Sequence, residues 1–194
     1  MGSEMCIRDR IEIEQAADAI RDCDAILIGA GAGMGVDSGL PDFRGDEGFW
    51  KAYPPMKRQG LSFYDLANPK WFHSDPTRAW GFYGHRRNLY RETLPHEGFQ
   101  TLLEWGNEKP GGCFVFTSNV DGHFQAAGFG ADKVVECHGA INLVQCAEPC
   151  SRKIWQAGDD EIDVDLESFR AEGELPACVV CLSLIHISEP TRPY

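Results

Sequence analysis

Residues 25–35 read AILIGAGAGMG, and this stretch predicts the first strand and turn of a nucleotide-binding α/β fold. The apolar run of residues 25–28 predicts a short buried strand, and the glycines from Gly29 to Gly35 predict a tight turn directly after it. Glycine has no Cβ, so the backbone N–H groups of such a turn can approach a pyrophosphate. Val36 stands where G-x-G-x-x-G has its third glycine. The turn alone therefore leaves open a purely structural role in packing a helix on the sheet.

Helical and strand patterns alternate on both sides of this turn. Apolar residues at helical spacing predict a first helix ending near Asp22, and further helices follow Ser74 and Pro95. Residues 113–116 and 133–137 predict two more strands. The order predicts an α/β fold, with a Rossmann-like parallel sheet and helices on both faces.

Polar residues follow the second and third predicted strands. Asn119 and Asp121 alternate with Val120, so both side chains can point into one cleft at the sheet's carboxyl edge. His138 follows the third strand, and an imidazole is the usual general base for a hydroxyl. A lone histidine is more often structural, so this interpretation needs further support.

A second candidate segment follows the glycine turn. Asp42, Phe43 and Arg44 place a carboxylate, an aromatic ring and a guanidinium on consecutive residues. They could hold a ribose or the loop, shield a reactive carbon from water and bind a phosphate, respectively. The alternative is a solvated surface turn.

Four of the eight cysteines form two short pairs. Cys146 and Cys150 are spaced C-x3-C, and Cys178 and Cys181 are spaced C-x2-C. These spacings predict a tetrahedral thiolate zinc site with a structural role, because no open position is left for catalytic water. An iron–sulfur site, disulfides or unpaired thiols are the alternatives.

Composition excludes several classes of function. The formal net charge is −12, which disfavours a nucleic-acid groove. No apolar run is long enough to span a membrane, and no signal peptide is recognisable. We expect a cytoplasmic protein with no nucleic-acid or membrane partner; the oligomeric state is left open.

The two ends differ from the rest of the chain. Met1–Arg10 and Ser183–Tyr194 resemble translated sequencing-adaptor sequence, and we expect both to lie outside the fold as a non-native leader and tail. Between them we expect a partial NAD-binding domain over residues 11–138, with a helical insertion at about 45–95. A small, incomplete zinc module should follow over residues 139–182.

The motifs together resemble the sirtuin family of NAD-dependent protein-lysine deacylases. The resemblance rests on residues 31–44 (GAGMGVDSGLPDFR), 117–121 (TSNVD) with Ala127 and Gly128, 136–139 (ECHG) and the two cysteine pairs, in that order. It implies NAD as co-substrate, structural zinc, and an acyl-lysine protein or peptide as substrate. The products would be nicotinamide, free lysine and O-acyl-ADP-ribose.

The resemblance also implies roles for individual residues. His138 would be the general base that takes a proton from the nicotinamide ribose, and Asn119 and Asp121 would organise the nicotinamide and the ribose. The cofactor-binding positions would be Gly31, Ala32, Gly33, Asp42, Phe43, Arg44, Ser118, Asn119 and Asp121. Tyr83 and Arg86 resemble the pair with which desuccinylase-like sirtuins hold an acidic acyl group; their spacing puts them on one helix face. The alternative is that both cover a surface helix.

Several departures from the family pattern bear on activity. Gly35 and Ser118 stand where the family usually has Ser and Gln, and His123-Phe124 replaces a pair in which His comes second. Nothing after Cys181 resembles the family's following segments, so we expect a C-terminally truncated chain with little or no activity. Two other functions remain open: a Rossmann-type oxidoreductase with structural zinc, or a non-catalytic zinc-bearing fragment.

Overall fold

The computed structural model describes residues 2–41, 45–148 and 150–188. Its first sheet is parallel, with strand order β1-β2-β3, and consists of β1 (Ile26–Ala30), β2 (Cys113–Thr117) and β3 (Val134–Glu136). Ile28 lies opposite Val115, and Val115 lies opposite Val134. The predicted Rossmann-like parallel sheet is confirmed, and all three strands lie where the apolar runs placed them.

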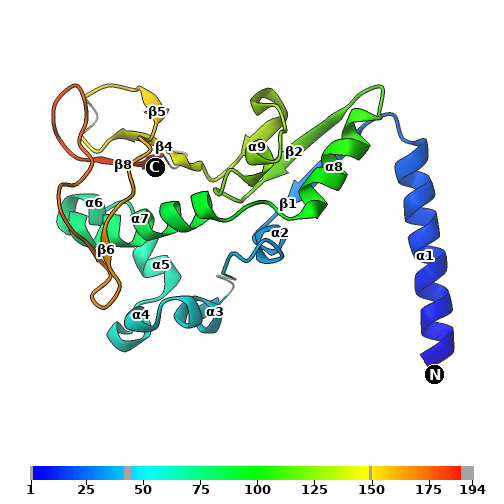
Figure 1. The fold of residues 1–194 in the computed structure, drawn as a ribbon, viewed down its shortest axis with the longest axis horizontal. Helices are drawn as coiled ribbons and strands as arrows, with labels where there is room; N and C mark the ends of the chain where they lie inside the picture. The colour runs from blue at the N-terminus through cyan, green and yellow to red at the C-terminus, as the bar shows by residue number, and fades with distance from the viewer. Residues whose placement is uncertain (1, 42–44, 149, 189–194) are drawn as a thin grey trace.

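One face of this sheet is covered by α8 (Glu97–Asn107) and α9 (His123–Ala126), as Figure 1 shows. Phe99, Phe124 and Phe129 pack there against Ile28 and Val115 to form a small aromatic core. A Cβ added at Gly106 would lie 2.7 Å from the Cβ of Cys113, so glycine allows α8 to approach β2 this closely. The remaining element of this region is the 3₁₀ helix η1 (Ala131–Lys133).

Short helices fill the segment between β1 and α8. They are α2 (Gly33–Val36), α3 (Gly45–Ala52), α4 (Pro54–Gln59), α5 (Phe63–Leu66), α6 (Trp71–Ser74) and α7 (Pro76–Glu92). The predicted start of α7 is confirmed: Asp75 is the N-cap, its carboxylate accepts a hydrogen bond from the Arg78 N–H, and Pro76 occupies the first turn.

The C-terminal part forms a second, antiparallel sheet of order β5-β4-β8 and a two-stranded hairpin. The sheet contains β4 (Ala140–Cys146), β5 (Ile154–Gln156) and β8 (Ile185–Ser188), and the hairpin contains β6 (Val164–Asp165) and β7 (Arg170–Ala171). The buried residues of this C-terminal part belong to the same hydrophobic cluster as those of the helical segment. In that cluster, Trp80, Phe82 and Tyr83 of α7 lie with Ile141 and Val144 of β4.

Both end segments differ from expectation. The first helix, α1 (Gly2–Asp22), extends back through the predicted leader, and it stands apart from the rest of the fold (Figure 1). Residues 185–188, which we expected outside the fold, form β8 beside β4. Ile185 and Ile187 alternate along this strand and are buried, because a period of two directs both side chains into the same core. No helix in the described ranges is long and apolar enough to cross a lipid bilayer.

Candidate functional site

The glycine turn lies against the carboxyl end of β2. The carbonyl of Gly31 accepts a hydrogen bond of 3.0 Å from Nδ2 of Asn119, and the N–H of Ser118 donates to the carbonyl of Ala30 at 3.1 Å. A Cβ added at Gly31 would lie 3.6 Å from Oγ of Ser118. The two motifs that the sequence separates by about 90 residues are therefore direct neighbours.

Asn119 and Asp121 are both almost buried at this strand end, each 9% exposed. The N–H of Asn119 donates to Oγ1 of Thr117 at 3.0 Å, and the N–H of His123 donates to Oδ1 of Asp121 at 3.0 Å. The other carboxylate oxygen of Asp121 faces Gly35, where an added Cβ would lie 3.6 Å from it. A loop with its side chains held in this way is preorganised before any ligand binds.

The turn that carries His138 is held against the same loop by backbone hydrogen bonds on either side. The N–H of Cys137 donates to the carbonyl of Thr117, and the N–H of Ile141 donates to the carbonyl of Val120, both at 2.9 Å. Gly139 has a φ of 84°, a left-handed conformation that favours glycine. His138 itself is exposed. The predicted catalytic residues thus gather at one edge of the sheet, with the histidine open to solvent.

Glu136, at the end of β3, is the first residue of the ECHG motif, and the motif alone assigns it no role. Burial raises the pKa of its carboxyl to about 6, partly offset by Gln125, whose Nε2 donates to Oε2 at 3.0 Å. The nearby charge of Asp121 raises this pKa further. Sequence alone cannot reveal this shift, because it arises from burial in the folded chain.

His123 is a second residue that the sequence left without a role. Its ring is 1% exposed and lies edge-on to Phe99, with 5.6 Å between the centroids. Within the described residues neither ring nitrogen has a hydrogen-bond partner. Phe124 beside it is also buried. The His123-Phe124 pair, which departs from the family pattern, therefore packs in the aromatic core under α8.

Several described cofactor positions are accessible from solvent. Ala32, Gly33 and Ser118 are exposed beside the glycine turn, and no bulky side chain projects from residues 31–33. Glycine and alanine leave the backbone of such a turn accessible to phosphate oxygens. Asp42, Phe43 and Arg44 lie outside the described residues.

The four paired cysteines converge on one point. Their Sγ atoms all lie within 4.8 Å of one another, with 3.5 Å between Cys146 and Cys181 and 3.7 Å between Cys150 and Cys178. A zinc ion bound at about 2.3 Å to each thiolate would put the sulfurs roughly 3.8 Å apart. The cluster is therefore the right size for zinc, and its four ligands leave no open position for catalytic water.

The surroundings of the second cysteine pair favour the ligating form of the thiol. Hydrogen bonding with Ser183 lowers the pKa of Cys181 to about 6, and backbone N–H groups lower the pKa of Cys178. Hydrogen bonding with Cys146 raises the pKa of Cys150 to about 12. A lowered pKa makes a cysteine easier to ionise, which favours a cation site because a metal binds the thiolate.

Tyr83 and Arg86 lie inside the protein and do not cover a surface helix. Tyr83 is 3% exposed and stacks on Phe72, and Arg86 is 7% exposed. The Arg86 guanidinium donates to the Tyr90 hydroxyl at 2.7 and 3.1 Å and lies about 5 Å from the ring centroids of Phe63 and Phe82. Although burial opposes its charge, the neighbouring tyrosines keep the pKa of Arg86 above its ordinary value.

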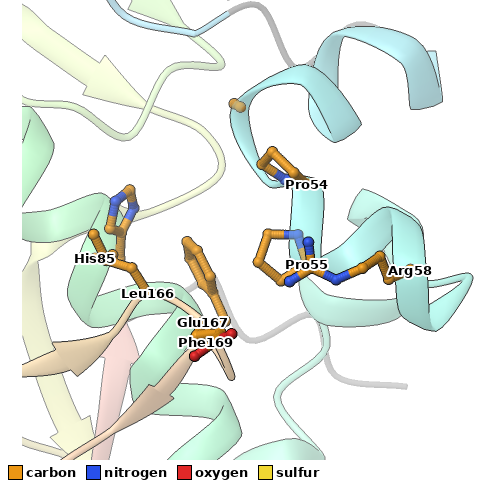
Figure 2. Close-up of a pocket in the computed structure, with 8 residues that line it drawn as sticks. Pro54, Pro55, Arg58, His85, Leu166, Glu167 and Phe169 are labelled. Carbon is orange, nitrogen blue, oxygen red and sulfur yellow. The ribbon is translucent and has the colours of Figure 1, made fainter.

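A hollow of about 560 Å³ lies between α4 and the β6–β7 hairpin (Figure 2). Pro55, His85 and Phe169 line it, and Nδ1 of His85 is 3.3 Å from the Tyr53 hydroxyl. Burial lowers the pKa of His85. None of the predicted site residues that the structure describes lines this hollow.

A protein-family model described as the Sir2 family matches residues 31–187, which include the glycine turn, the strand ends and all four clustered cysteines. The chain belongs to the Sir2 family. An NAD-dependent protein deacylase of Aquifex aeolicus is 37% identical over 123 residues, 63% of this chain and 47% of the relative. An NAD-dependent protein deacetylase of Saccharolobus solfataricus is 34% identical over 134 residues, 69% of this chain and 49% of the relative.

Solved structures agree with this assignment. A Sir2 homolog in complex with NAD superposes with a TM-score of 0.65 and 27% identity, covering 91% of this chain and 60% of the homolog. A Sir2 homologue with ADP-ribose gives a TM-score of 0.62 and 28% identity, with 85% and 57% coverage. This Sir2-family chain spans about half the length of the curated relatives it matches.

Proposed function

We propose that this Sir2-family protein is an NAD-dependent protein-lysine deacylase that transfers the acyl group of a modified lysine to ADP-ribose and releases nicotinamide. The hydrogen bond from Asn119 to the Gly31 carbonyl supports the proposal most directly, because it joins the glycine turn to the polar strand end. Relatives named deacylases and a homolog structure with NAD support the same chemistry.

Exposed and buried side chains have different roles in this reaction. His138 is exposed beside the turn and acts as the general base that accepts a proton from a ribose hydroxyl. Asn119 and Asp121 are nearly buried and fix the shape of the loop that receives the nicotinamide and its ribose. Gly31, Ala32, Gly33 and Ser118 are assigned to binding the phosphates and ribose, and the family resemblance extends this role to Asp42, Phe43 and Arg44.

Zinc, in this proposal, is structural. Cys146, Cys150, Cys178 and Cys181 hold it in the small module of residues 139–182, and residues 11–138 form the partial NAD-binding domain with its helical insertion at about 45–95. The metal cluster includes none of the residues at the strand ends, which supports a structural role.

The acyl group that suits this protein best is an acidic one. Arg86 keeps its positive charge among aromatic rings, and Tyr83, three residues earlier, lies on the same face of α7. A carboxylate at the end of a succinyl or malonyl chain would pair with the guanidinium, whereas an acetyl group would gain nothing from it.

The decisive experiment mixes NAD with succinyl-, malonyl- and acetyl-lysine peptides and measures the release of nicotinamide. Because the chain spans half the length of its relatives, it is assayed alone and as a chimera that replaces the matched half of the Aquifex aeolicus deacylase. Nicotinamide release that depends on an acyl-lysine peptide supports the proposal. Formation of NADH without nicotinamide release would instead favour an oxidoreductase.

A further inference from the structure

His96, the residue before α8, joins the loop after the glycine turn to the start of that helix (Figure 1). Nε2 of its ring lies 3.1 Å from the carbonyl oxygen of Met34 in α2. Its backbone N–H donates to Oγ of Ser38 at 3.0 Å. One residue therefore holds this loop at two points, which lie 62 and 58 residues away along the chain.

The hydrogen bonds of the His96 ring define which nitrogen carries the proton. The N–H of Gly98 donates to Nδ1 at 3.0 Å, so Nδ1 is the acceptor that caps α8. The carbonyl of Met34 can only accept, so Nε2 carries the proton and donates to it. Both bonds require the same neutral tautomer. The ring therefore has two separable functions, because one nitrogen caps α8 and the other holds α2.

The surroundings of the ring keep it in this position. Phe99 is fully buried and lies edge-on to the ring of His96, with 5.1 Å between the centroids. A Cβ added at Gly98 would lie 2.9 Å from Nδ1 of His96, so glycine allows the ring to lie over the first turn of the helix. Met34 packs against the aromatic core that contains Phe99. The hydrogen bond from His96 to Met34 is thus built into the packing of α2 on α8.

α2 also lies beside the candidate site. Gly35 is buried, and a Cβ added there would lie 3.6 Å from Oδ2 of Asp121. Asn119 holds the start of the turn through the carbonyl of Gly31, and His96 holds Met34 three residues later. Because both ends of residues 31–34 are fastened, this part of the turn keeps one conformation before a ligand is present.

We propose that His96 is a positioning residue for the cofactor, and that it acts through the carbonyl of Met34 to fix the glycine turn in the conformation that receives NAD. This role rests on the proposed function, because it requires residues 31–33 to bind the dinucleotide. A turn that is already ordered loses less conformational freedom on binding, so NAD binds more tightly. Because His96 acts through the backbone of another residue, it affects NAD affinity and not the rate of the bound complex.

Two substitutions separate the two functions of the ring. His96→Asn puts an amide oxygen near the position of Nδ1, so it still caps α8, but it is too short to reach Met34. His96→Gln puts an amide N–H near the position of Nε2, so it still donates to Met34, whereas glutamine is a poor cap. Ser62→Ala is the control for a lost cap, because Ser62 caps a different helix, α5.

NAD affinity and stability are measured separately for each variant. Calorimetry on the chimera with the Aquifex aeolicus deacylase gives the Kd for NAD, and thermal unfolding of the 194-residue chain gives Tm. His96→Asn should raise Kd about 5–10-fold, as expected for one lost hydrogen bond, and should change Tm less than His96→Gln does. His96→Gln and Ser62→Ala should lower Tm by about 2–4 °C and leave Kd within about twofold. In all three variants kcat at saturating NAD should stay within about twofold.

A Kd for NAD that His96→Asn leaves unchanged overturns this role, because His96 would then be a helix cap alone. Equal losses of affinity in His96→Asn and His96→Gln also overturn it, since the bond to Met34 would not be responsible. If His96→Asn does not fold, Gly98→Ala decides, because it keeps the imidazole but crowds it, and should raise Kd in the same way. A chimera that binds no NAD before any substitution overturns the proposed function, and the role of His96 with it.

Discussion

At the scale of single residues, Glu136 makes stability depend on pH. Its pKa is raised to about 6 in the folded chain, so folding favours the protonated carboxyl. Above pH 6 the ionised carboxylate lowers the stability of the fold. This loss of stability disappears as the pH falls through 6 towards 4.3, the ordinary pKa of a glutamate. Because the side chain is partly solvated, the cost is discounted to below about 1 kcal/mol.

Glu136→Gln should therefore raise Tm at pH 8 by up to about 3 °C and leave it unchanged at pH 4.5. The glutamine keeps an oxygen that can accept the hydrogen bond from Gln125. Thermal unfolding followed by circular dichroism at the two pH values measures the effect. Glu161→Gln, at an exposed position, is the control and should change neither value. A lower Tm at pH 8 for Glu136→Gln would show that the charge stabilises the fold.

His138→Ala tests the general base in the chimera described above. Loss of a positioned base should lower the rate of nicotinamide release by about 10²–10⁴-fold. NAD affinity, measured by calorimetry, should change far less, because His138 is exposed and accepts no hydrogen bond that shapes the loop in the described structure. Equal losses of affinity and rate would assign His138 to binding instead.

Arg86→Met in the same chimera tests the acyl preference. Methionine keeps an unbranched apolar stem but removes the cation, so kcat/KM for succinyl-lysine should fall at least tenfold, whereas the value for acetyl-lysine should fall little. Tyr64→Phe, which removes one exposed hydroxyl, serves as the control. An acetyl preference in the unmodified protein that Arg86→Met leaves in place would contradict the assignment.

At the scale of elements, α7 and the β6–β7 hairpin are joined by a close backbone contact. A Cβ added at Gly81 would lie 2.8 Å from the carbonyl carbon of Phe169 and 2.9 Å from Cα of Arg170. Phe169 has a φ of 55°, so this turn already holds a conformation that side chains disfavour. Gly81→Ala should therefore destabilise the protein by about 1–3 kcal/mol, measured by urea unfolding.

Gly158→Ala is the matched control, since the nearest atom to its added Cβ is 3.7 Å away, at the carboxylate of Asp160. Its free energy of unfolding should stay within about 0.5 kcal/mol of the wild-type value. Equal stability of both variants would mean that the contact between α7 and the hairpin can adjust to one added methyl group without a measurable loss of stability.

Sequence patterns predicted the elements whose signals are local. The apolar runs gave the three parallel strands, and Asp75-Pro76 gave the start of α7. They did not give β8, because Ile185 and Ile187 form too short an alternation to identify a strand without its partner β4. The burial of Arg86 was missed for a similar reason, since it depends on rings contributed by α5 and α7 together.

In the candidate site, too, the sequence identifies the residues with a local signal and misses the features that depend on packing. Spacing identified the four cysteines, and the resemblance identified Asn119, Asp121 and His138, whose turns the structure brings to one sheet edge. The raised pKa of Glu136 and the buried ring of His123 depend on packing by α8 and α9, and no local pattern reports such packing. What remains unpredictable is thus the environment of a side chain, because distant segments create it.

At the scale of the whole molecule, the metal cluster is connected to the largest hydrophobic cluster. Cys146 lies opposite Ile185 in the β4–β8 pairing, and Nε1 of Trp80 donates to the carbonyl of Ile185 at 3.2 Å. Cys146 and Cys178 are themselves members of the cluster that contains Trp80 and Tyr83. Loss of the metal should therefore loosen β8 and reach α7, well beyond the cysteines themselves.

The purified chain should contain about one zinc ion, and Cys150→Ala should release it. Because the free energy of metal binding is also free energy of folding, both Cys150→Ala and a chelator should lower Tm by about 5–10 °C. Tryptophan emission should shift to longer wavelength as Trp80, fully buried in the intact protein, meets water. Cys23→Ala, at a cysteine outside the cluster, should keep the zinc and the emission maximum. Elemental analysis that finds no zinc in folded protein would contradict the assignment, and a normal Tm after chelation would show that the hydrophobic cluster holds the module together without it.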